Sequence, residues 1–240
     1  MWLICSSLGK KLIMSITGIS LILFLLFHML MNLVALIPAN AEGIYPYNVL
    51  CALLGANWYA LIAAKGLAVL SVVHIGFAFW LYFSNRKARG SDYAVTARPK
   101  EVEWASQNML ALGIVIFVFL VFHLYHFWAK MQLVEVLYLL GMASSEAYAK
   151  ATEGIYFLRQ IFSNPIWVIF YLVAFVALWF HLTHGFWSAL QSMGINNQKW
   201  FNRLRIAGNA FVTFIMLGFS LVVVVFYIQS LLGCGTACVL

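Results

Sequence analysis

The segment FVFLVFHLYHFW, residues 117–128, carries His123 and His126 one helical turn apart in a run without a charged residue. A later segment, ALWFHLTHGFW at 177–187, repeats this spacing with His181 and His184. Single histidines, His28 and His74, occur in the apolar runs LFLLFHMLMN and LSVVHIGFAF. All 6 histidines of the chain therefore lie in strongly hydrophobic segments, and these segments decide both the fold and the candidate function.

The composition excludes an ordinary soluble domain. Of the 240 residues, 65% are hydrophobic and 9% are charged, whereas soluble domains carry about a quarter charged residues. The apolar runs are about 20 to 26 residues long, which as helix crosses roughly 30 Å of hydrocarbon. The alternating segments of a transmembrane β-barrel do not occur. We predict an all-α fold, a polytopic transmembrane bundle of five helices in a single domain over 1–240, with spans near 12–37, 58–83, 105–130, 166–190 and 208–232.

The first apolar run follows Lys10 and Lys11, as in a signal peptide, but it is too long and lacks a small-residue cleavage site. We therefore expect a retained span. Lysine and arginine accumulate on the cytoplasmic side of membrane proteins. Ten of the 14 basic residues fall on one side of the predicted topology: Lys10, Lys11, Arg86, Lys87, Arg89, Arg98, Lys100, Lys199, Arg203 and Arg205. The N-terminus is thus predicted to be cytoplasmic, and the net charge of +7 follows from this asymmetry without a nucleic-acid partner.

The histidines sort by depth, because each helical residue advances about 1.5 Å along a span. The first and third spans run outward and place His28 and His123 in the outer half. The second and fourth run inward and place His74 and His181 in the inner half. Four histidines on four helices therefore form two predicted layers, here called the outer pair (His28 with His123) and the inner pair (His74 with His181).

A histidine in hydrocarbon is costly unless it finds a partner. Two facing imidazoles at one depth fit the axial positions of a haem iron, and bundle cores hold such cofactors. We predict a four-helix haem-binding core with two b haems, one bound by each pair. Small residues would give the porphyrin room: Gly18, Ser20, Gly66, Ser71, Gly76, Ala78, Gly113 and Gly185. The alternatives are histidines hydrogen-bonded to neighbouring helices and small residues that mark plain helix packing.

His126 and His184 lie about 4.5 Å further along their helices than the predicted ligands. Their expected roles are secondary: a hydrogen bond to a haem edge, a propionate or a quinone, or a satisfied interior histidine. The cysteines, Cys5, Cys51, Cys234 and Cys238, form no CxxC motif, so neither covalent haem attachment nor a zinc site is expected. Cys234 and Cys238 are spaced for a disulfide, although free thiols are the favoured interpretation.

These segments resemble the five-helix dihaem cytochrome b that forms the membrane anchor of succinate:quinone oxidoreductases, the family of succinate dehydrogenases and fumarate reductases. KKLIMSITGISLILFLLFHMLMN is similar to the first helix of that family, and VVHIGFAFWLYF to its second haem helix. FHLYHFW and FHLTHGFWS are similar to the third and fourth. The resemblance covers nearly the whole chain and implies that His28, His74, His123 and His181 are the ligands. His126 and His184 are outside the family pattern, and Lys65 stands where the family often has an acidic residue.

The resemblance implies an anchor in the bacterial cytoplasmic membrane, within a respiratory chain. A flavoprotein subunit and an iron–sulfur subunit on the cytoplasmic side would interconvert succinate and fumarate and carry electrons. This chain would relay the electrons through two haems to menaquinone. It has neither a GxGxxG motif nor a cysteine set for an iron–sulfur cluster, so it is not expected to act on the dicarboxylate by itself.

Quinone chemistry couples electrons to protons, so a quinone site needs a protonatable or hydrogen-bonding group. The outer loop offers Glu42 and Asn48, and a solvated loop glutamate is the alternative for Glu42. At the cytoplasmic span ends, Ser15 and Trp104 are candidates for contacts with haem propionates. Trp is also common at membrane interfaces without any such role.

Two other functions compete with this interpretation. A cytochrome b subunit of a hydrogenase or formate dehydrogenase would bind two haems and serve different soluble partners. A transporter or structural anchor would use the histidines for protons or for packing alone. Transporters tend to show broken helices and repeated halves, which this sequence lacks.

Overall fold

The computed structural model describes residues 6–89, 104–195 and 197–233, and over these residues all regular structure is helical. Five helical segments are long and apolar enough to cross a membrane: Leu8–Leu36, Trp58–Ala88, Met109–Trp128, Pro165–Ser192 and Lys199–Leu231. Each predicted span falls on one of these segments, and the predicted all-α, five-span fold is confirmed. The Cys234–Cys238 pair, Cys5 and most of the polar segment after the second span lie outside the described residues.

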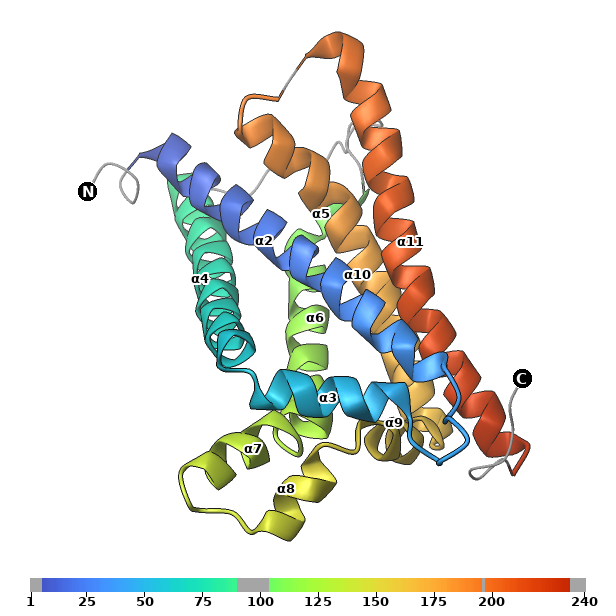
Figure 1. Ribbon diagram of the computed structural model, residues 1–240. Helices are drawn as coiled ribbons and strands as arrows, with labels where there is room; N and C mark the ends of the chain where they lie inside the picture. Colours follow the sequence, from blue (N-terminus) through green and yellow to red (C-terminus); the bar gives the residue numbers. More distant parts are fainter. Residues whose placement is uncertain (1–5, 90–103, 196, 234–240) are drawn as a thin grey trace.

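Within the described ranges, the spans and their connections divide into twelve elements (Figure 1). In chain order these are α2 (Ser7–Leu33), η1 (Val34–Leu36), α3 (Pro46–Ala56), α4 (Trp58–Arg89), α5 (Trp104–Gln107), α6 (Met109–His123), η2 (Leu124–Trp128), α7 (Gln132–Leu139), α8 (Ser145–Ala151), α9 (Gly154–Phe162), α10 (Pro165–Ser192) and α11 (Gln198–Leu231).

Helix boundaries follow local capping chemistry. The Ser6 side chain accepts a hydrogen bond from the Gly9 N–H at 3.0 Å, which begins α2. Pro46 and Pro165 occupy the first positions of α3 and α10, where a missing N–H costs nothing. The Asn164 side chain caps α10 by accepting from the Ile166 N–H at 2.9 Å.

The five spanning segments alternate in direction, and the short helices α3, α7, α8 and α9 lie together at one end (Figure 1). We call α3, α7, α8 and α9 the cap. The opposite end, where α2 begins and α4 ends, is called the basic end because Lys10, Lys11, Lys87, Lys199 and Arg203 lie there. The connection after the third span is partly helical as α7 and α8, whereas α3 occupies part of the stretch that the sequence analysis treats as an outer loop.

The tightest packing joins α2, α10 and α11. Met29, Val212 and Ile215 are fully buried there. A Cβ at Gly218 of α11 would overlap the Met29 side chain, so this glycine sets how closely α2 and α11 approach. The core therefore includes α11, which is not one of the four helices of the predicted haem-binding core.

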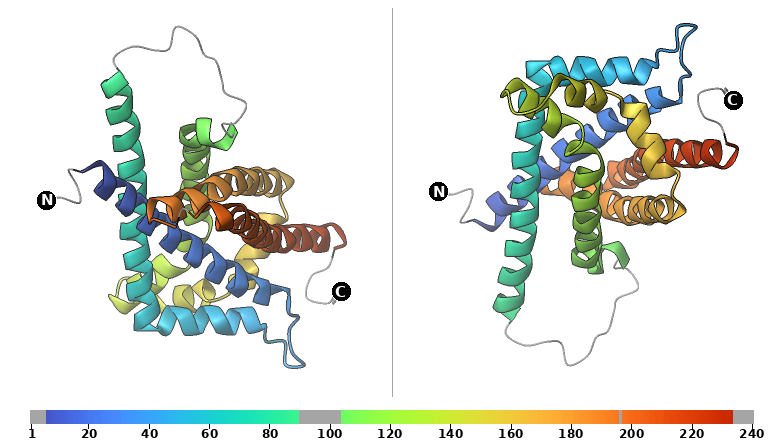
Figure 2. Two further views of the ribbon diagram at one scale, coloured as in Figure 1. Left: turned by 90° about the horizontal axis from the view of Figure 1, so that it is seen from above. Right: turned by 90° about the horizontal axis from the view of Figure 1, so that it is seen from below.

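Helix α4 lies at the edge of the bundle, on the opposite side from α11 (Figure 2). It packs mainly on α2, and none of its described residues is buried. Helix α4 is consequently held to the bundle mainly through its contact with α2, on the side that carries His74.

We predict that Gly218→Ala is less stable than the matched change Gly76→Ala by about 1–3 kcal/mol, because only the first overpacks a filled site. Gly76 has open space where a Cβ would be placed. Thermal unfolding in detergent measures the difference. Equal unfolding midpoints would contradict the close contact between α2 and α11.

Candidate functional site

Four histidines from four different helices meet in two pairs. His28 of α2 and His123 of α6 have ring centroids 5.8 Å apart. His74 of α4 and His181 of α10 have ring centroids 6.4 Å apart. These are the outer and inner pairs that depth along the spans predicts. Their role as ligands stays a prediction.

Aromatic rings enclose the outer pair. Phe24 stacks on His28 at 5.3 Å, and Phe219 lies 5.6 Å from the same ring. Phe119 and Phe127 lie 5.6 Å and 5.4 Å from His123. The imidazoles thus sit in an apolar environment, in which a bond to a cation or metal is stronger than in water.

The inner pair is oriented by α2. The Thr17 hydroxyl donates to the Ile13 carbonyl at 2.8 Å, and its oxygen lies 3.0 Å from His74 Nδ1. Since the hydroxyl proton is already used, Nδ1–H is assigned as the donor to Thr17. Nε2 then keeps its lone pair free for a metal, and a hydrogen bond on the other ring nitrogen is the usual support of a metal-bound histidine. Gly18 leaves room for the ring, with a Cβ position 3.5 Å from His74 Cε1.

In each pair, one buried ring nitrogen has no hydrogen-bond partner among the described residues: Nδ1 of His123 in the outer pair and Nδ1 of His181 in the inner pair. Leaving a buried polar atom unpaired costs about 1–3 kcal/mol. A metal bound at these nitrogens would remove this cost, because either ring nitrogen of a neutral imidazole can be a ligand.

The glycines divide into two kinds. A Cβ on Gly55, Gly154, Gly208 or Gly218 would overlap a neighbouring side chain, so these four serve packing. Gly66, Gly76, Gly113 and Gly185 have nothing within 4 Å of the Cβ position. Gly185 lies one turn from His181 on the same side of α10, whereas Gly76 lies about 200° around α4 from His74. Of these four, Gly185 best fits the predicted role of giving a cofactor room.

The residues fit a haem better than a metal bound by the protein alone. Among the described residues no three His, Cys, Asp or Glu side chains gather closely enough to hold a metal ion. A haem iron needs only two protein ligands. Two imidazoles that each bound one iron through a bond of about 2.0 Å would have ring centroids roughly 6 Å apart, and the two pairs lie at 5.8 Å and 6.4 Å.

His126 is a hydrogen-bonded interior histidine. It lies in the π-helical turn η2, in which the Ala129 N–H donates to the Leu124 carbonyl at 2.8 Å. The His126 ring packs edge-on against Trp167 at 4.3 Å, and its Nδ1 lies 3.2 Å from the Tyr171 hydroxyl. This geometry satisfies one of the roles expected for the second histidine of the motif. His184 of the other motif packs edge-on against Trp187 at 5.0 Å.

The remaining predicted site residues do not gather around one cavity. Ser15 is buried, and its hydroxyl donates to the Lys11 carbonyl at 2.9 Å. Trp104 is exposed and packs on Phe180. Glu42 is exposed in its loop, while Asn48 Oδ1 accepts from the Ile155 N–H at 3.0 Å and joins α3 to α9.

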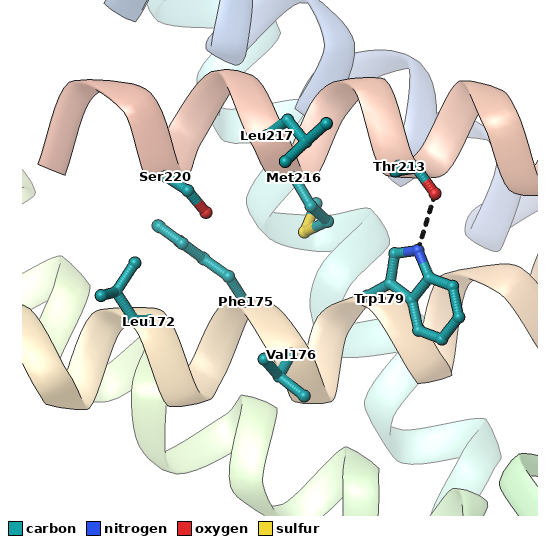
Figure 3. A pocket seen from close by; sticks show the side chains of 8 residues that line it. All are labelled: Leu172, Phe175, Val176, Trp179, Thr213, Met216, Leu217 and Ser220. Atoms are coloured by element: carbon teal, nitrogen blue, oxygen red, sulfur yellow. Dashed lines mark hydrogen bonds between the residues drawn. The ribbon is translucent and has the colours of Figure 1, made fainter. Parts of the chain in front are cut away.

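A shallow groove of about 260 Å³ runs between α10 and α11 (Figure 3). The Trp179 Nε1–H donates to the Thr213 hydroxyl at 2.8 Å beside it. Trp179 lies two residues before His181, which places it about 200° around the helix. The groove therefore faces away from the inner pair and is no part of the histidine site.

Sequence reasoning missed two functional candidates, Thr17 and Glu135. Thr17 stands directly before Gly18, and only the crossing of α2 and α4 reveals its partner. Glu135 of α7 is 4% exposed and lies directly against Gly55 of α3. Burial raises the pKa of Glu135 to about 7. The signal in the sequence is a single acid in the apolar run LVEVLYLL.

The fold and composition define a multi-pass helical membrane protein. Comparison of the chain with protein-family models, curated proteins and solved structures finds no match. Its function is therefore inferred from the histidine pairs and their surroundings.

We predict that Glu135→Gln changes the pH dependence of stability. Because the pKa of Glu135 is raised to about 7 in the folded chain, the ionised carboxylate disfavours folding. Wild-type stability should fall as pH rises from about 4.5 through 7, by on the order of 2 kcal/mol, and this loss should be absent in the variant. Unfolding midpoints between pH 4.5 and 8 measure it, with the exposed Glu42→Gln as the matched control. Identical pH profiles for wild type and Glu135→Gln would contradict a buried acid.

Proposed function

We propose that this chain is the membrane anchor and electron-transfer subunit of a succinate:quinone oxidoreductase, in the cytoplasmic membrane of a bacterium. It would relay electrons between an iron–sulfur subunit and menaquinone. The observation that carries the proposal is the meeting of His28 with His123 and of His74 with His181, each pair drawn from two helices.

The outer pair would hold one b haem and the inner pair the other. When bound, such a group supplies one-electron oxidation and reduction without proton chemistry of its own. The protein contributes the rest. Thr17 fixes the tautomer of His74, and aromatic side chains keep water from the outer pair.

Partner docking is proposed at the basic end. Lys11, Lys87, Lys199 and Arg203 are exposed there. An iron–sulfur subunit with an acidic face would be attracted to this surface and steered toward the inner pair. The flavoprotein subunit would then bind to the iron–sulfur subunit, away from the membrane.

Menaquinone is proposed at the opposite end, beside the outer pair. Glu42 is exposed to solvent at that end, as proton exchange with a quinone requires. Asn48 supports the site through its hydrogen bond to α9, because its side-chain oxygen is already occupied there.

We predict that His28→Ala or His123→Ala removes half of the reduced b-type absorbance, and that His74→Ala or His181→Ala removes the other half. Each variant deletes an axial ligand from one layer only. His126→Gln should retain both halves, since the role of His126 is a hydrogen bond to Tyr171. Reduced-minus-oxidised spectra of the purified complex are the measurement. Equal spectra for all five variants would contradict the ligand assignment.

We further predict that Thr17→Val weakens the inner haem alone. Without the hydroxyl acceptor, His74 loses the bond that fixes its tautomer, an outer contact whose loss typically costs about 10- to 100-fold in metal affinity. Ser20→Ala on the same helix is the control, because the Ser20 hydroxyl donates to the Ile16 carbonyl of its own helix. Haem retention during dialysis, followed separately for each layer, tests this. Loss of the outer haem instead would refute the positioning role.

A further inference from the structure

Glu135 is a buried acid that electron transfer between the two pairs does not use. It lies in the cap, on α7, and its carboxylate packs directly against Gly55 of α3. The neighbouring α7 side chains Tyr138 and Leu139 are exposed. Glu135 therefore lies just below the surface of the cap. The side chains of α3 lie on its other side, toward the interior of the bundle.

Cys51 is the first group on that side. It stands one helical turn before Gly55, and the Glu135 charge acts on it, helping burial to raise the pKa of the thiol to about 11. Cys51 is therefore a neutral thiol at any ordinary pH. It is the free cysteine of the described residues, and its sulfur and the ring of Tyr47, one helical turn before it on α3, both lie against Gly154 of α9.

Tyr47 carries the connection into the spanning bundle. Its hydroxyl donates to Asn32 Oδ1 at 3.2 Å. Asn32 Nδ2 donates to the His28 carbonyl at 2.8 Å and lies 3.5 Å from both ring nitrogens of His28. Polar side chains thus lead from Glu135 through α3 to the outer pair, and hydrogen bonds join the part from Tyr47 to His28.

The other ionisable side chains near α7 have different contacts. Tyr148 stacks on Tyr138, Lys150 lies over Tyr156 and Lys130 over Tyr125. His126 bonds Tyr171, and Glu146 is exposed. In the described part of the chain, Cys51 and, beyond it, Tyr47 are the ionisable groups that couple Glu135 electrostatically to charges in the bundle.

We propose that Glu135 is a proton-exchange site whose protonation is coupled to the charge of the outer pair through Cys51, Tyr47 and Asn32. This inference rests on the proposed function, because it requires an electron to arrive at the outer pair. When one electron arrives from the iron–sulfur partner or from quinol, the Glu135 carboxylate takes one proton from water at the cap and an O–H bond forms. When the electron leaves, the proton returns to water.

The aligned hydrogen bonds transmit the electrostatic effect; no proton moves along them. Asn32 cannot relay a proton without changing its amide, but its dipole and that of the Tyr47 hydroxyl respond to a charge at either end. The weakly polar surroundings preserve this interaction over a distance at which water would screen it.

The first test is infrared difference spectroscopy of the complete complex between pH 5 and pH 9. Wild type should show a protonated carboxyl band that titrates near neutrality and that Glu135→Gln lacks. Glu42→Gln should keep the band. A band that does not titrate in this range, or that survives in Glu135→Gln, would overturn the proposal.

The second test is a redox titration of both haems at pH 6 and pH 8. The reduction equilibrium of the outer haem should change by about fivefold between these values in wild type and by less than about twofold in Glu135→Gln. The inner haem serves as the internal control. Tyr47→Phe should weaken the coupling while the carboxyl band persists, and Tyr45→Phe, whose hydroxyl accepts from Arg159 Nη2 at 3.0 Å, should not. An equal pH response in wild type and Glu135→Gln would refute the coupling.

The two proposals fail in different ways. A complex without b haem would overturn the proposed function and the redox coupling, and the infrared titration would still decide whether Glu135 exchanges a proton. If both haems are present and their reduction potentials are the same in wild type and Glu135→Gln, only the coupling of Glu135 to the outer pair is overturned.

Discussion

An imidazole buried among apolar helices has to find a partner, and this requirement organises the whole bundle. His126 meets it with the Tyr171 hydroxyl, and His74 meets half of it with Thr17. His123 and His181 each keep a buried ring nitrogen without a hydrogen bond from any described residue. The same rule therefore separates His126, whose hydrogen bond is made, from His123 and His181, whose hydrogen bonding is incomplete among the described residues. These two histidines come one from each predicted pair, which supports the haem proposal.

Helix packing differs between the two sides of the bundle. Helices α2, α10 and α11 form a close core in which Gly218 admits Met29. Helix α4 has no buried residue among those described, yet it supplies His74 to the inner pair. Under the proposed function, a group held between His74 and His181 would tie α4 to α10. The stability of that edge of the bundle would then depend on the cofactor, because a ligand that binds only the folded state stabilises it.

Hydrophobicity and helical spacing control the features that the sequence predicts well. Five spans, their alternating directions and the meeting of His28 with His123 follow from run length and from a constant rise per residue. Contacts between helices leave no such pattern. Thr17 acts on His74 from 57 positions away, and α3 resembles a loop in sequence because its helix is short and begins at Pro46. The π-turn after His123 and the burial of Glu135 arise from packing of η2 and α7, which has no periodic signal.

The ratio of haem b to polypeptide in the purified complex tests the central claim most directly. Extraction of the pigment and quantification against the 27.1 kDa chain should give two b haems per copy. A colourless chain, or one that holds a single haem with all four histidines present, would contradict the account of two histidine pairs that each bind an iron.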